Sequence, residues 1–99
     1  MVRLAKSVRP EGGTRPIRVT LLYFGQARDA AGSAEEAFSL PTAATVEALL
    51  RESFAAHPAV RKVVMVESVQ VAVNEELAER GRVLGDGDVV AILPPVAGG

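Results

Sequence analysis

The chain has 99 residues, of which 48% are hydrophobic and 23% are charged, and this balance predicts one folded domain with a single modest core. It contains no cysteine and one histidine, which excludes disulfides, thiolate nucleophiles and cysteine metal sites and leaves no metal site to expect. Because the sequence holds neither a membrane-length apolar run nor a signal peptide, we expect a cytoplasmic protein without membrane contact.

Charge is distributed unevenly along the chain. Residues 1–16 contain four basic side chains and one acidic one, whereas the remainder contains seven basic and eleven acidic. The first sixteen residues also lack periodicity and include Pro10, Gly12, Gly13 and Pro16, so they predict a flexible leader. The acidic remainder suits a basic protein partner and argues against nucleic acid.

Hydrophobic side chains alternate over residues 17–24, which predicts a strand. Its core face comprises Ile17, Val19, Leu21 and Tyr23. The opposite face begins polar and becomes apolar at Leu22 and Phe24. This strand therefore presents apolar side chains on both faces near its end.

The next two elements are short. Gly25 ends the first strand, and residues 26–31 predict a short helix that Gly32 stops. A second strand is predicted over residues 35–40, closed by Pro41.

A helical period begins after Thr45. Its apolar stripe comprises Val46, Leu49, Leu50 and Phe54. Either Thr42 or Thr45 is expected to cap this helix, and His57-Pro58 to end it. A shorter helical turn is predicted over residues 60–65.

The last third of the chain returns to alternation. Residues 69–74 predict a strand followed by a turn at Asn74-Glu75, and residues 89–93 predict the final strand. Residues 85–88, Gly-Asp-Gly-Asp, are typical of a turn. Pro94-Pro95 cannot donate to a sheet, so strand pairing must stop there.

The order strand, strand, helix, strand, strand predicts an α+β fold. One main helix packed across one face of a mixed sheet is the economical arrangement, because a helix with one apolar stripe needs one sheet face. This is the β-grasp, or ubiquitin-like, fold. We expect it over residues 17–94, preceded by the leader and followed by a flexible tail at residues 95–99.

Few side chains are candidates for catalysis. His57 lies at a helix end, where a solvated or capping role is expected, so no nucleophile, histidine and acid set can form. The glycines of residues 85–88 lead into a strand, which favours a turn over a phosphate loop, and Asp86 and Asp88 are expected to be turn residues. A solvated charge run, or at most a rim that attracts a basic partner, is expected at Glu75, Glu76 and Glu79.

The C-terminus is the strongest candidate site. Pro94 and Pro95 stiffen the exit from the last strand, and Val96-Ala97 then leads to Gly98 and Gly99. A tail without terminal side chains can be threaded into a narrow cleft, where its backbone approaches a ligand closely. The group it delivers is the carboxylate of Gly99, which must be activated, for example as an acyl-adenylate, before conversion to a nucleophilic thiocarboxylate.

A second candidate is an apolar docking patch. By strand parity, Ala91 and Leu93 lie on the face that also carries Leu22 and Phe24. Apolar side chains on a solvent face suggest partner binding. The alternative is that residues 22–33 fold back and cover them.

Four segments in order carry a family pattern: LYFGQARDAAG (22–32), LPTAATVEALL (40–50), VAVNEE (71–76) and DGDVVAILPPVAGG (86–99). Through these segments the chain over residues 17–99 resembles the small, sulfur-carrying subunit of molybdopterin synthase, the MoaD family of ThiS-type, ubiquitin-like sulfur carriers. Residues 1–16 have no counterpart in the family.

The resemblance implies a thiocarboxylate on Gly99, with no catalytic side chain and no permanently bound cofactor in this chain. A MoeB-like adenylating enzyme would use ATP, and a cysteine desulfurase or rhodanese would donate the sulfur. The tail would then enter a MoaE-like large subunit, whose lysines act on a cyclic pterin precursor to install the dithiolene sulfurs. The carrier would be active only with that subunit, for molybdenum cofactor biosynthesis.

The same resemblance implies the partner contacts. Hydrophobic contacts are expected from Phe24, Leu77 and Leu93. Tail contacts are expected from Pro94, Pro95, Val96 and Ala97. Asn74 and residues 86–88 fall in shared motifs and are expected to be structural.

Three alternatives stay open. A ThiS-like carrier of thiamine synthesis shares the fold and the Gly-Gly end but typically lacks the segments at residues 22–32 and 94–99. A ubiquitin-like modifier would join Gly99 to lysines of other proteins, although Lys6 and Lys62 offer little for chain building. In a plain β-grasp interaction module the tail would be inert.

Overall fold

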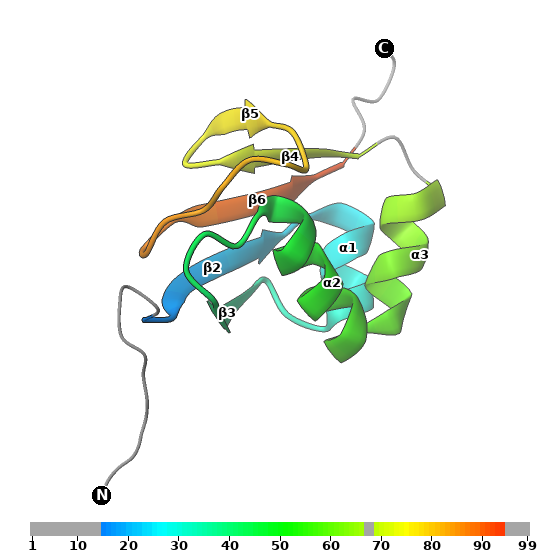
Figure 1. Cartoon of the computed structure of the whole chain (residues 1–99). Coiled ribbons are helices and arrows are strands. Elements are labelled where there is room, and N and C mark those ends of the chain that lie inside the picture. Colours follow the sequence, from blue (N-terminus) through cyan, green and yellow to red (C-terminus); the bar gives the residue numbers. More distant parts are fainter. Residues whose placement is uncertain (1–14, 67–68, 95–99) are drawn as a thin grey trace, which may run out of the picture.

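The fold is a five-stranded mixed sheet with helices packed across one face, as Figure 1 shows for the computed structural model. The model describes residues 15–66 and 69–94. Its strands are β2 (Ile17–Tyr23), β3 (Glu35–Leu40), β4 (Gln70–Val73), β5 (Glu76–Ala78) and β6 (Val89–Leu93). Its helices are α1 (Gly25–Ala31), α2 (Val46–Ala56) and α3 (Pro58–Val66). The sheet order is β3-β2-β6-β4-β5, which confirms the predicted β-grasp fold.

The two central strands, β2 and β6, run parallel, and every other neighbouring pair is antiparallel. The predicted core face of β2 is confirmed, because all four of its side chains are buried. β2 ends at Tyr23, one residue earlier than expected, because Phe24 is the N-cap residue of α1. A central parallel pair places the ends of β2 and β6 at the same edge of the sheet.

The helix α2 covers the core as its stripe predicts. Val46, Leu49 and Leu50 are fully buried, and the Thr45 hydroxyl accepts a hydrogen bond from the Ala48 N–H at 3.2 Å. Thr45 is therefore the N-cap, which supplies an acceptor for one of the unpaired N–H groups of the first turn. His57 is the C-cap, as expected from its place before Pro58.

The third helix is longer than predicted. We expected a turn over residues 60–65, whereas α3 spans Pro58–Val66. Proline is suited to the first position of a helix, because the N–H that it lacks has no partner there. None of the helices within residues 15–66 and 69–94 is long and apolar enough to cross a membrane.

The strand β5 was not predicted. Asn74 and Glu75 both have positive φ, 50° and 73°, and form the tight turn of a β4–β5 hairpin. Glu76 therefore belongs to a strand, although its side chain is exposed as the charge-run interpretation requires. Three residues between acidic neighbours are too few to show an alternating pattern.

Candidate functional site

Within the described residues, the helices lie on one face of the sheet, and the other face carries an apolar hollow. We call this hollow the outer trough; it is lined by Leu22, Phe24, Ala72, Leu77, Val89, Ala91 and Leu93, with Asn74 and Glu75 at one end. Its volume is about 570 Å³. The trough contains all three predicted hydrophobic contact residues, Phe24, Leu77 and Leu93.

Strand register explains why this face is hollow. Leu22 pairs with Ala91, Ala91 with Ala72, and Ala72 with Leu77, so these four side chains form one row across four strands. The two alanines form the floor of the row and the two leucines form its walls. A large apolar side chain of another molecule fits between such walls.

The outer trough is open to solvent. Leu77 is 63% exposed and Phe24 is 43% exposed. Residues 22–33 do not fold back over it, because α1 buries Ala27 in the core on the opposite side of the sheet. Exposed apolar side chains gathered in this way are typical of a protein-binding surface.

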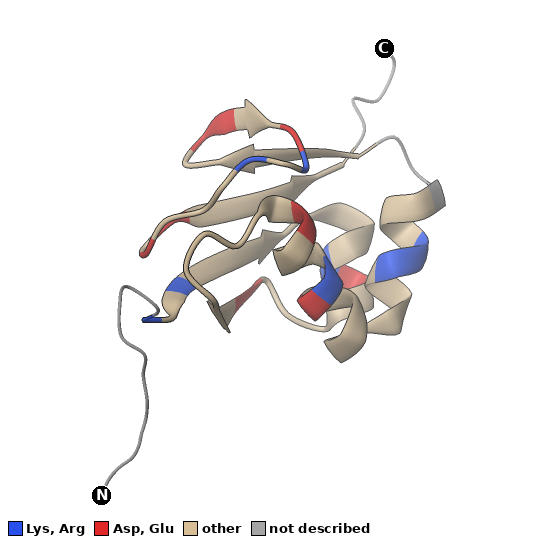
Figure 2. Cartoon of the chain, viewed as in Figure 1, with Lys and Arg blue, Asp and Glu red and all other residues tan. Residues whose placement is uncertain are grey.

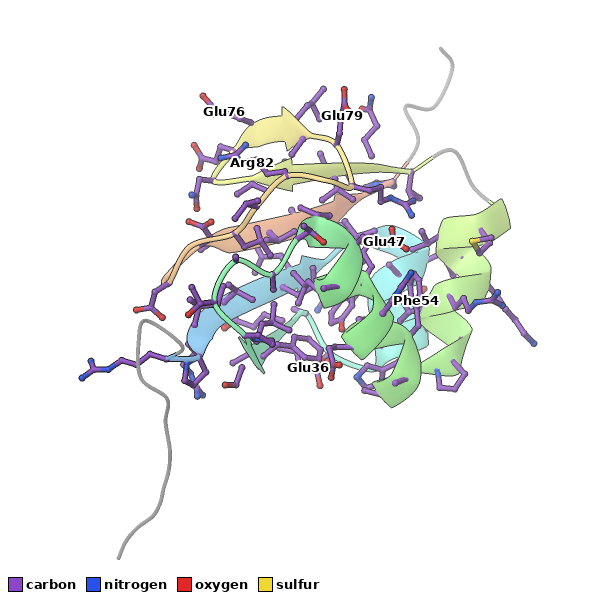
Figure 3. The ribbon with its side chains drawn as sticks, in the orientation of Figure 1. Glu36, Glu47, Phe54, Glu76, Glu79 and Arg82 are labelled. Atoms are coloured by element: carbon purple, nitrogen blue, oxygen red, sulfur yellow. The ribbon has the colours of Figure 1, made fainter. Side chains whose placement is uncertain are left out.

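Acidic side chains border the trough at the β4–β5 hairpin. Glu75 lines the trough itself, and Glu76 and Glu79 are exposed elsewhere on the same hairpin, outside the trough lining. Figure 2 shows this acidic hairpin, and Figure 3 shows Glu76 and Glu79 extending from it. Arg80 is the basic residue that follows Glu79 in the sequence, and it forms an ion pair with α2: its Nη1 lies 3.6 Å from Oε1 of Glu47. The rim therefore favours a partner with basic groups.

A network of hydrogen bonds fixes the turn before β6. Asn74 Nδ2 donates to Asp88 Oδ1 at 2.9 Å, and the Val89 N–H donates to Asn74 Oδ1 at 2.9 Å. The Gly85 N–H donates to Asp88 Oδ2 at 2.8 Å and, together with Asn74, holds the pKa of Asp88 below its ordinary value. Asn74 and Asp88 are thus structural residues, as expected, and they connect β6 to the hairpin that walls the trough.

The turn also binds back to the first strand. Asp86 Oδ1 accepts a hydrogen bond from the Arg18 N–H at 2.8 Å. The prediction of a turn at residues 85–88 is confirmed, with Gly87 at a φ of +88° that suits glycine.

The predicted tail begins beside the trough. Pro94 is exposed and follows directly on β6, whose last residue, Leu93, lines the trough. Pro95, Val96, Ala97, Gly98 and Gly99 lie outside the described residues, so their roles stay predictions, and so does the predicted leader up to residue 14.

A polar cluster lies on the helix side of the sheet, away from the trough. Tyr23 donates to Glu36 Oε1 at 2.9 Å, its oxygen lies 2.8 Å from Ser53 Oγ, and His57 Nε2 lies 2.8 Å from the same Glu36 oxygen. The single phenol proton goes to Glu36, so the Ser53 hydroxyl supplies the proton of the second bond. His57 is therefore a partner of Glu36 as well as a helix cap.

Burial raises the pKa of Tyr23 to about 12, and the carboxylate of Glu36 adds to the rise. The sequence analysis did not predict this cluster. Ser53 lies four residues after Leu49 on the apolar stripe of α2 and is fully buried. A polar residue on that stripe indicates a buried hydrogen-bond partner, and this could have pointed to the cluster.

A five-stranded β-grasp sheet with helices on one face places the chain in the ubiquitin-like structural class. The ThiS family model matches residues 21–99, and the chain belongs to this family. It is 39% identical over 85 residues to the molybdopterin synthase sulfur carrier subunit of Chlamydomonas reinhardtii, with 84% of this chain and 100% of that protein covered. This similarity confirms the resemblance to the MoaD family.

Solved structures agree with the family. The small archaeal modifier protein SAMP1 of Haloferax volcanii superimposes with a TM-score of 0.71 at 29% identity, covering 83% of this chain and 99% of that one. A protein complex of subunits 1 and 2 of the molybdopterin-converting factor of Helicobacter pylori contains a chain that matches at 25% identity with a TM-score of 0.59, covering 84% of this chain and 100% of that one.

Proposed function

We propose that this chain is the sulfur carrier subunit of a molybdopterin synthase and carries sulfur as a thiocarboxylate on Gly99. The observation that carries the proposal is the similarity to the Chlamydomonas reinhardtii sulfur carrier subunit over the full length of that protein. The family match extends to Gly99 itself.

The chemistry follows from the carboxylate. Attack of a Gly99 oxygen on the α-phosphorus of ATP forms an acyl-adenylate and releases pyrophosphate. The outer sulfur of a persulfide on the donor then attacks the carbonyl carbon, and the C–O bond to AMP breaks to leave an acyl disulfide. A thiol reductant cleaves its S–S bond, which releases the thiocarboxylate and leaves a disulfide on the reductant and donor. An E1-like, MoeB-like enzyme performs the activation, and a desulfurase or rhodanese supplies the sulfur. The resulting anionic sulfur is a strong nucleophile that this cysteine-free chain has no other group to provide.

The outer trough is the docking surface for the large subunit. It lies at the edge where Leu93 and Pro94 lead into the tail, so a partner bound there is placed to receive Gly99. The acidic rim at Glu75 suits basic groups on that partner. The complex of two subunits known from Helicobacter pylori supports a partner of this kind.

Intact-mass measurement tests the function. The purified chain is incubated with its adenylating enzyme, ATP and a sulfur donor, and then mixed with the large subunit and the pterin precursor. We expect a mass gain equal to the exchange of one oxygen for sulfur, followed by loss of that gain as dithiolene forms. A chain that is never converted, while a control carrier is, would contradict the proposal.

A protein modifier is the second candidate, because SAMP1 of Haloferax volcanii is similar over 83% of this chain. In that case activated Gly99 would form isopeptide bonds with lysines of other proteins. Expression of a tagged chain, followed by peptide mapping for lysines that carry a remnant of its C-terminus, distinguishes the two functions. After trypsin this remnant is residues 83–99, because Arg82 is the last basic residue. Sulfur transfer without such remnants favours the carrier.

A further inference from the structure

The parallel pair β2–β6 brings two chain segments together at the edge of the sheet where the tail begins. Thr20 pairs with Val89, and Tyr23 with Ile92. The same offset, continued by two residues, aligns Gly25 with Pro94. At this level the first segment turns into α1 (Figure 1), and the second has left β6, which ends at Leu93.

Gly25 and Pro94 are in close proximity. A Cβ atom at Gly25 would lie 3.4 Å from Pro94 Cβ and 3.8 Å from Pro94 Cγ. Gly25 also has a φ of +55°, which turns the chain from Phe24 into α1 and favours glycine. The proline ring therefore packs against a backbone position without a side chain.

A cavity adjoins this contact. Gly25, Pro94, Phe24 and Gln26 line a cavity of about 220 Å³, and Val63 of α3 also lines it. The ring therefore has space beside it to move if a side chain larger than a methyl group at position 25 pushes against it.

We propose that Gly25 is a positioning residue for the tail: no long side chain extends from it toward Pro94, and this preserves the direction in which the chain leaves β6. This inference rests on the proposed sulfur-carrier function. Five residues follow Pro94, and a chain of that length reaches at most ~17 Å. A misplacement of the reacting group by ~1 Å can lower a rate about 100-fold, so the direction of the chain at Pro94 bears on transfer.

The test compares Gly25→Asn with Gly32→Asn. Gly32 is the matched control, because it lies at the other end of α1, has a φ of +79°, and has no atom within 4 Å of a built Cβ. Asparagine tolerates positive φ better than other side chains, which keeps backbone strain small in both variants. Only at position 25 does the new side chain meet Pro94.

The assay is sulfur transfer from each thiocarboxylated variant to the pterin precursor in the presence of the large subunit, under single-turnover and steady-state conditions. We expect Gly25→Asn to lower kcat by roughly tenfold with little change in KM, because docking through the trough is intact, whereas Gly32→Asn transfers like the wild type. Combining Gly25→Asn with Pro94→Ala should slow transfer no further than the slower single variant, since both remove the same contact.

A smaller variant keeps the test decisive if Gly25→Asn folds poorly. In Gly25→Ala the new Cβ would lie at contact distance from Pro94 without displacing it, so transfer should fall much less. If Gly25→Ala and Gly25→Asn lose the same fraction of the transfer rate, the effect comes from backbone strain and the inference is wrong. A normal transfer rate with Gly25→Asn would also overturn it. If the wild type and Gly32→Asn also fail to transfer sulfur, the proposed function itself fails.

Discussion

Truncation of Leu77 to alanine is the most informative test of the outer trough. Leu77 forms one wall of the trough and is 63% exposed, so its side chain contributes little to folding and has most of its surface left to bury on docking. Full burial of a leucine side chain is worth about 1.5–3 kcal/mol, of which docking recovers roughly two thirds, or about 1–2 kcal/mol. We therefore expect Leu77→Ala to raise the Kd for the large subunit by about 5–30-fold.

Met65 provides the matched control. It is also 63% exposed but belongs to α3, on the helix side of the sheet. Calorimetric titration of the large subunit should give Met65→Ala a Kd close to that of the wild type, and thermal melts should place both variants near the wild type. Unchanged binding by Leu77→Ala, or equal weakening by Met65→Ala, would refute the assignment of the trough as the docking surface.

Three further predictions test the trough, the polar cluster and the turn. Ala91→Leu fills the floor of the trough and should weaken binding of the large subunit while leaving the melting temperature nearly unchanged; unimpaired binding would contradict the fit. Because the pKa of Tyr23 is raised from 10.0 to about 12 in the folded state, its stabilising contribution is complete below pH 10 and is lost as pH rises toward 12, by roughly 3 kcal/mol. Urea unfolding between pH 10 and pH 12 should show this loss of unfolding free energy in the wild type and not in Tyr23→Phe. Because Tyr23 is the only tyrosine, the absorbance of tyrosinate gives its pKa directly. Asp88→Ala should lower the free energy of unfolding by about 1 kcal/mol at neutral pH. Because the folded state lowers the pKa of Asp88, the difference from the wild type should shrink as pH falls below 3.8; a constant difference would rule out the charged hydrogen bonds as its source.

Most of the fold could be predicted because its signals are local. The alternation of Ile17 to Tyr23 and the helical stripe from Val46 depend on neighbouring residues alone. The cap, for which Thr42 and Thr45 were the two candidates, and the turn at residues 85–88 likewise have signals in their own residue types. The hairpin partner β5 was missed because its pairing depends on the positive φ of Glu75, which sequence pattern does not show.

The site was predictable only in part, because its geometry depends on pairing between residues far apart in the sequence. Strand parity placed Leu22, Phe24 and Leu93 on one face, and the structure agrees. Parity does not give register, however, so the alignment of Ala91 with Ala72 that hollows the trough could not be foreseen. The bonds among Tyr23, Glu36 and Ser53 join residues thirteen and thirty positions apart, which no local pattern predicts.

The central claim, that the terminal carboxyl group is the reactive centre and the folded domain presents it, is tested most directly by adding one alanine after Gly99. The variant keeps the trough, the turn network and the Gly25–Pro94 contact, so it should fold normally and bind the large subunit with wild-type affinity. Dithiolene formation by the reconstituted synthase should fall to background with this variant and proceed with the wild type. Continued sulfur transfer by the extended chain would contradict the account.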